Sequence, residues 1–110
     1  MLPTGKRIFV AGYHQSRFGK LGAVSIADIV HKALSELSAE TRIPLEAVDT
    51  ASIGGLLTTV LGNQTLLAGL VAAEPGLEGK PVEAVENACA TGGQAILSVV
   101  WKMLLGMGDV

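Results

Sequence analysis

Residues 81–105 read PVEAVENACATGGQAILSVVWKMLL and join an extended run, a turn of small residues and a long apolar run. The first part, Pro81–Glu86, is short and bounded by a proline and a polar turn, which indicates a strand. The part from Cys89 to about Leu105 is too long for one strand and indicates a helix. A strand that leads directly into a helix is a building unit of α/β folds.

The helix expected from Cys89 onward is apolar around its whole circumference, with Lys102 as its one charged residue. Its large apolar residues are Ile96, Leu97, Val99, Val100, Trp101, Met103, Leu104 and Leu105. A helix of this composition is buried on every side. A small domain cannot cover it alone, so we expect a further layer from downstream sequence or from a partner.

The rest of the chain alternates short strand-like runs with helical periodicity. Ser25 followed by Asp28 is a capping-box pattern, and apolar residues at helical spacing continue to Leu37. The other expected elements are a strand at Arg7–Gly12, a helical turn at Pro44–Val48, a strand at Thr50–Gly54, a helix from Asn63 or Gln64 to Ala73, and the first residue of a fourth strand at the end of Gly106–Val110. This order predicts an α/β fold with a largely parallel sheet.

The composition is that of a compact domain, since 49% of the 110 residues are hydrophobic and 16% are charged. A formal net charge of −2 gives no electrostatic case for nucleic-acid binding. Four cations near the start form either a solvated edge or a contact for an anionic ligand such as a phosphate of coenzyme A. They are Lys6, Arg7, Arg17 and Lys20.

Cysteine and histidine usage sets further bounds. A single cysteine excludes an internal disulfide, and the isolated His14 and His31 lack metal-ligand spacing. We therefore expect a protein of the reducing cytoplasm, with no signal peptide in its opening residues. The uncharged segment Thr50–Ala73 is long enough to cross a bilayer, but its glycines and central amides favour a strand, a loop and a helix.

The position of Cys89 at the strand-to-helix junction favours a nucleophile. A helix N-terminus stabilises a thiolate through its dipole and its unpaired N–H groups, and the N–H of Cys89 itself can help to bind an oxyanion. Asn87 can hold the turn by bonding its own backbone. The neighbouring residues are small and leave room for a bulky acyl substrate: Ala88, Ala90, Thr91, Gly92 and Gly93. This combination suits acyl transfer through a thioester.

A second reading of Cys89 stays open, in which it is a small buried hydrophobic residue. A catalytic thiol also needs a base within hydrogen-bond reach, usually a histidine. Nothing in the sequence directs His14 or His31 toward Cys89. The chain contains no glycine-rich dinucleotide motif, P-loop or G-x-S-x-G motif.

The stretch VENACATGG resembles the active-site cysteine segment of the thiolase family, N-x-x-C-[AS]-[ST]-G. Its VENAC form is most similar to the sterol-carrier-type and archaeal acetyl-CoA C-acetyltransferases. The similarity extends to IFVAGYHQSRFGKL, SIADIVHKAL, the GGLL and LGNQ stretches and the closing GMGDV. The resemblance implies that residues 1–110 are part of a thiolase-like N-terminal domain, in which helices cover both faces of a mixed, largely parallel sheet.

This resemblance implies an acyltransferase of lipid metabolism that works by Claisen condensation or thiolytic cleavage of acyl-CoA. Cys89 would carry the acyl group, and its backbone N–H would line the oxyanion hole. Coenzyme A thioesters are the implied substrates, with no separate cofactor, metal ion or membrane contact. The implied homodimer or tetramer pairs the strand before the cysteine, and an enzyme of an acyl-CoA pathway is a further candidate partner. The interface residues would be Pro81, Val82, Glu83, Ala84, Val85 and Glu86.

The family's catalytic histidines and frequent second cysteine belong to C-terminal motifs that residues 1–110 lack. We therefore expect this chain alone to be inactive. The alternative is a non-catalytic, thiolase-like scaffold subunit that binds acyl-CoA or a partner enzyme. Ketoacyl synthases and hydroxymethylglutaryl-CoA synthases share the fold and the cysteine, but VENACATGG and the F-G-K opening fit them less well.

Overall fold

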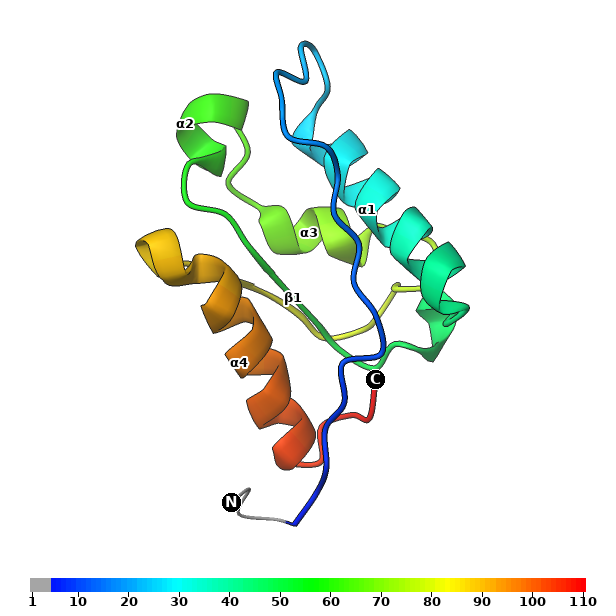
Figure 1. Cartoon of the computed structure of the whole chain (residues 1–110). Coiled ribbons are helices and arrows are strands. Elements are labelled where there is room, and N and C mark those ends of the chain that lie inside the picture. Colours follow the sequence, from blue (N-terminus) through cyan, green and yellow to red (C-terminus); the bar gives the residue numbers. More distant parts are fainter. Residues whose placement is uncertain (1–4) are drawn as a thin grey trace.

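The computed structural model describes residues 5–110, in which two short parallel strands lie between helices (Figure 1). In chain order the elements are α1 (Ile26–Thr41), the 3-10 turn η1 (Leu45–Ala47), β1 (Ala51–Gly54), α2 (Thr58–Gly62), α3 (Leu67–Ala72), β2 (Val82–Val85), the 3-10 turn η2 (Ala88–Ala90) and α4 (Thr91–Leu104). In the register of the sheet, Ala51 lies opposite Val82 and Gly54 lies opposite Val85. The predicted α/β fold is confirmed.

The hydrophobic core lies on one side of the sheet, under α1 and α3. Its buried centre consists of Val30, Val71 and Leu77. Partly buried side chains pack around this centre: Ile26, Leu34, Leu45, Val48, Ala51, Ile53, Leu70 and Val82. Helix α4 packs against β1 and β2 from the other side, so that both faces of the sheet are covered (Figure 1).

The first helix begins at the predicted capping box. The Ser25 hydroxyl accepts a hydrogen bond from the backbone N–H of Asp28 at 3.0 Å, and the Asp28 carboxylate accepts one from the backbone N–H of Ser25 at 3.1 Å. These bonds satisfy N–H groups that have no acceptor within the helix. Hydrogen bonds from the side chain and backbone of Ser25 hold the pKa of Asp28 below its ordinary value.

Replacing Ser25 with alanine is expected to lower the free energy of unfolding by about 1 kcal/mol at pH 7, because the cap is lost. The pKa of Asp28 is lower in the folded state than in the unfolded state. Ionised Asp28 therefore stabilises the fold at a pH above its pKa in the unfolded state. This stabilisation is lost as the pH falls through the pKa of Asp28 in the folded state. The difference between wild type and Ser25→Ala should therefore shrink below about pH 4. Urea denaturation at pH 7 and pH 3 measures both values, and a difference that does not shrink contradicts the prediction.

The strand predicted at Arg7–Gly12 is wrong, because the segment is extended but pairs with no strand among residues 5–110. Phe9 and Val10 are 75% and 90% exposed, so they gain little from burial. The chain is instead anchored just before this segment, through the side chain of Lys6. The ammonium group of Lys6 donates to the carbonyl oxygen of Met103 at 3.0 Å and lies 2.7 Å from the Asp109 carboxylate.

The helix predicted from Asn63 or Gln64 to Ala73 begins later, at Leu67, and a separate helical turn, α2, precedes it. The reason is the left-handed backbone of Asn63, at φ 49°, whose N–H donates to the carbonyl of Thr58 and so ends α2. The membrane-span alternative for Thr50–Ala73 is also wrong, since this segment holds a strand and two short helices. None of the described helices is long and apolar enough for a bilayer.

The strand at Thr50–Gly54 and the turn at Pro44–Val48 are confirmed as β1 and η1. Gly106, at φ 76°, turns the chain out of α4. Val110, the last residue of the sequence, belongs to no strand within residues 5–110, and its carbonyl accepts a hydrogen bond from the backbone N–H of Asp49 at 2.8 Å. The chain end therefore lies beside the start of β1.

Helix α4 leaves one apolar stripe uncovered. Ile96, Leu97, Trp101 and Leu105 are 67%, 47%, 52% and 77% exposed and recur at helical spacing. The buried residues of α4 are Thr91 and Ser98, and Thr91 lies against Gly54 of β1. The prediction that residues 5–110 cannot cover this helix alone is confirmed by these exposures.

Candidate active site

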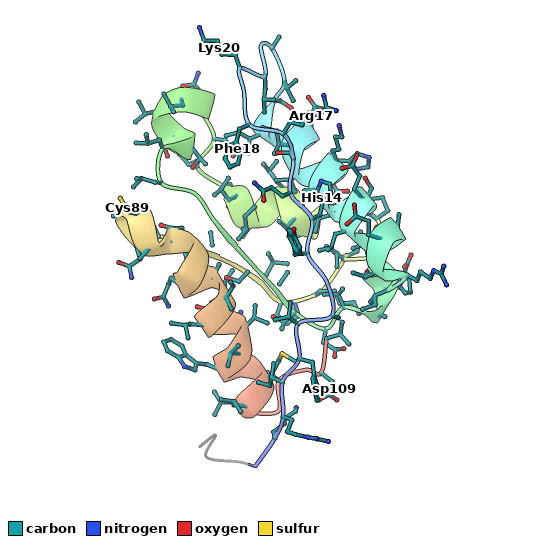
Figure 2. The ribbon with its side chains drawn as sticks, viewed as in Figure 1. His14, Arg17, Phe18, Lys20, Cys89 and Asp109 are labelled. Atoms are coloured by element: carbon teal, nitrogen blue, oxygen red, sulfur yellow. The ribbon has the colours of Figure 1, made fainter. Side chains whose placement is uncertain are left out.

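Cys89 lies in the turn η2, between the end of β2 and the start of α4. Its thiol is free and exposed, and Figure 2 shows it at the outer end of the helix, away from the core. Within residues 5–110, Cys89 is therefore not a core residue. The predicted strand-to-helix junction is confirmed, with a 3-10 turn as its first part.

The turn is held by the side chains of Thr91 and Glu86. The Thr91 hydroxyl accepts a hydrogen bond from the backbone N–H of Asn87 at 2.8 Å and donates to the carbonyl of Ala88 at 2.7 Å. The Glu86 carboxylate accepts a hydrogen bond from the backbone N–H of Ala88. Thr91 is buried, so its two hydrogen bonds are partly shielded from water, whereas the Glu86 bond is exposed.

The sequence does not identify Thr91 or Glu86 as the residues that hold this turn, and it indicates Asn87 in that role. The Asn87 side chain makes no capping hydrogen bond. Thr91 was noted only as a small neighbour, although a threonine three or four residues after a turn can bond the turn backbone. That pattern is the signal that could have found it.

The residue before the cysteine adopts an uncommon backbone conformation. Ala88 has φ 46°, in the left-handed region that costs a residue with a Cβ roughly 1–2 kcal/mol. The hydrogen bonds of Glu86 and Thr91 both end on Ala88 backbone groups and stabilise this conformation. Such strain is concentrated at functional sites, where it fixes the direction of a reactive side chain.

The turn is also fixed to the sheet through Gly54 at the end of β1. A Cβ atom at this position would lie 2.3 Å from the Cγ2 methyl of Thr91 and 3.1 Å from the carbonyl oxygen of Val85. Only glycine therefore lets Thr91 approach β1 this closely. The position of Cys89 therefore depends on the carboxyl ends of both strands, through Gly54 of β1 and Val85 of β2.

The surroundings of Cys89 are open. A Cβ atom added at Gly92 or Gly93 would meet no atom within 4 Å. Both glycines belong to the first turn of α4, where backbone N–H groups have no acceptor within the helix. The site therefore combines an exposed thiol, unoccupied space and the positive end of a helix of 14 residues.

A small cavity of about 230 Å³ lies at the carboxyl ends of β1 and β2. Its walls include Gly55, Thr58, Thr59, Thr65, Val85 and Glu86. Open α/β sheets bind ligands at this end of their parallel strands. The cavity shares Glu86 with the turn that carries Cys89, so the two features are adjacent.

Both histidines are held by glutamates on other elements. The His14 ring lies 2.7 Å from Glu36 and 3.2 Å from Glu40, and His31 lies 2.7 Å from Glu74. Figure 2 shows His14 across the molecule from Cys89. The structure therefore does not bring His14 to the thiol as a base.

Comparison with known proteins places these features in a family context. The chain is 28% identical over 103 residues to an acetyl-CoA acetyltransferase of Methanocaldococcus jannaschii, covering 94% of the chain and 26% of that protein. It is 33% identical over 96 residues to sterol carrier protein 2 of Homo sapiens, covering 84% of the chain and 17% of that protein. The chain matches part of a thiolase-family protein.

A third relative is the non-specific lipid-transfer protein-like 2 of Caenorhabditis elegans, 28% identical over 113 residues, 99% of the chain and 26% of that protein. The chain thus spans about a quarter or less of the length of these relatives. No family model matches the chain. The thiolase resemblance of the cysteine segment and the small parallel sheet with helices agree with one another.

Proposed function

We propose that this chain supplies the nucleophilic cysteine of a thiolase-type acyltransferase, as part of that enzyme's N-terminal domain. The observation that carries the proposal is the exposed Cys89 at the start of α4, in a turn fixed by Glu86 and Thr91. The similarity to acetyl-CoA acetyltransferases supports acyl-CoA as the substrate class.

In the proposed reaction the Cys89 thiolate attacks the carbonyl carbon of an acyl-CoA. A carbon–sulfur bond to Cys89 forms, and the coenzyme A thiolate leaves. A base then removes a proton from the α-carbon of a second acyl-CoA, and the resulting carbanion attacks the acyl group on Cys89. A carbon–carbon bond forms and the Cys89 thiolate is released, while N–H groups at the start of α4 stabilise each oxyanion.

The histidine base and the second cysteine of this mechanism must come from polypeptide outside residues 1–110, so the 110-residue chain alone is inactive. That polypeptide would cover the exposed stripe of α4, Ile96, Leu97, Trp101 and Leu105. In the same proposal, the free edge of β2 pairs across a two-fold axis in a dimer. The open edge supports this, because β2 pairs only with β1 among the described residues.

Alkylation with iodoacetamide tests the proposal. One label per chain is expected at Cys89 by peptide mass spectrometry, because the thiol is exposed at a helix N-terminus. Preincubation of the complete gene product with acetyl-CoA should block this label and add one acetyl group at Cys89 instead. A thiol that takes iodoacetamide but gains no acetyl group contradicts the proposed function.

The second candidate is the non-catalytic scaffold, which is favoured by the absence of a base next to Cys89 within residues 5–110. In that case acetyl-CoA, or a partner enzyme, binds but leaves Cys89 unmodified. The intact mass of the complete gene product after incubation with acetyl-CoA therefore separates the two candidates.

A further inference from the structure

We infer a second binding site, separate from Cys89, in the cavity between residues 14–24 and α1, and we assign it to an amphiphile with one carboxylate head group. The cavity has a volume of about 800 Å³, in the range of small-molecule sites. Its walls are mainly apolar, and Leu21, Val24, Ile29 and Ala33 form them. A flexible apolar ligand tail therefore fits its surface.

One residue beside the cavity pairs the loop with α1. The His14 ring lies 2.7 Å from the Glu36 carboxylate and 3.2 Å from that of Glu40, one helical turn further on. This contact lies at one end of the loop, and His14 and Glu36 both line the cavity. At the other end the loop rejoins the helix at its capping residue, Ser25.

The anionic side chains of the cavity wall already have partners. The Asp28 carboxylate accepts hydrogen bonds from Ser25, at 2.6 Å from the hydroxyl and 3.1 Å from the backbone N–H. Glu36 is paired with His14 and lies 3.8 Å from the ammonium group of Lys32. These carboxylates are therefore neutralised or hydrogen-bonded without a ligand.

Arg17 is the charged wall residue that has no ion pair within residues 5–110. Arg17 is exposed, and Figure 2 shows it over α1, whereas Lys20 points away from the helix. A guanidinium binds a carboxylate through two parallel hydrogen bonds. With Asp28 and Glu36 nearby, one free cation favours a single negative charge over a doubly charged phosphate.

This site does not depend on the proposed acyltransferase function. None of the cavity residues belongs to β1, β2, η2 or α4, and Cys89 lies across the molecule (Figure 2). Loss of the thiol should therefore leave ligand binding unchanged. A failure of either proposal can be recognised separately.

Calorimetric titration of the full chain with sodium decanoate, below its micelle concentration, tests the site. Decanoate should bind with a stoichiometry of one, and Arg17→Gln should weaken binding about tenfold, because a charge-assisted contact is lost. Lys20→Gln removes the same charge from the same loop outside the cavity and should change affinity less than about twofold. Decanol should bind more weakly than decanoate and equally to wild type and Arg17→Gln.

Methyl chemical shifts locate the ligand independently of affinity. Decanoate should shift the methyl signals of Leu21, Val24 and Ile29 in wild type and in Cys89→Ala. The inference is overturned if decanoate does not bind, if Arg17→Gln and Lys20→Gln weaken it equally, or if the shifts centre on the exposed stripe of α4. Loss of binding in Cys89→Ala would likewise overturn it.

Discussion

Replacing Cys89 with alanine is expected to abolish acyl transfer by the complete gene product, lowering kcat by at least about a thousandfold. The thiolate forms the covalent intermediate, and no other cysteine is present in residues 1–110 to take its place. The assay is thiolytic cleavage of acetoacetyl-CoA by coenzyme A, followed by the loss of acetoacetyl-CoA absorbance. Because Cys89 is exposed, the substitution should leave the melting temperature nearly unchanged.

A double variant tests whether position matters as well as chemistry. Cys89→Ala combined with Ala90→Cys moves the thiol by one residue, and both positions are exposed. This variant should remain inactive while still reacting with iodoacetamide, because the new thiol points in another direction from the turn. If Cys89→Ala alone keeps more than about a tenth of the activity, no covalent intermediate on Cys89 is required and the proposed mechanism is contradicted.

The helix and strand positions that the sequence predicted well are those with strong local signals. Ser25 and Asp28 mark the start of α1 by a bond that forms within three residues, so it needs no tertiary context. The strand β2 is bounded by Pro81 and a polar turn, and it forms within the predicted range. The exposed stripe of α4 was expected because the helix has more apolar surface than a small domain can cover.

One error concerns a feature that depends on a distant partner, and the other two differences concern local backbone contacts that composition does not specify. The run Arg7–Gly12 has strand composition, but a strand also needs a neighbour that accepts its hydrogen bonds, and sequence composition cannot supply one. The sequence pattern predicts that a helix starts at Asn63 or Gln64, but the left-handed backbone of Asn63 ends the preceding helix. At the candidate site, the motif and the junction identify Cys89, whereas Thr91 acts through local hydrogen bonds with Asn87 and Ala88, for which the sequence carries only the signal of a threonine just after a turn.

The dependence of the cysteine turn on Gly54 predicts a large stability effect. Gly54→Ala is expected to lower the free energy of unfolding by about 3 kcal/mol, because its Cβ would lie 2.3 Å from the Thr91 methyl and 3.1 Å from the Val85 carbonyl oxygen. Thr91 cannot rotate away without breaking its two hydrogen bonds to the turn. Urea denaturation of wild type and variant measures the loss.

Thr91→Ser provides the matched rescue, since it removes the methyl group in the clash and keeps the hydroxyl that holds the turn. The double variant Gly54→Ala/Thr91→Ser should recover at least about 1 kcal/mol relative to the sum of the single variants, which is the coupling expected for residues in contact. Gly92→Ala is the control for adding a methyl group, because its Cβ meets no atom within 4 Å and alanine favours the helix. It should stabilise the chain by up to about 1 kcal/mol. Zero coupling between positions 54 and 91 would mean that the glycine does not set the approach of Thr91, and that the cysteine turn is held by its own hydrogen bonds alone.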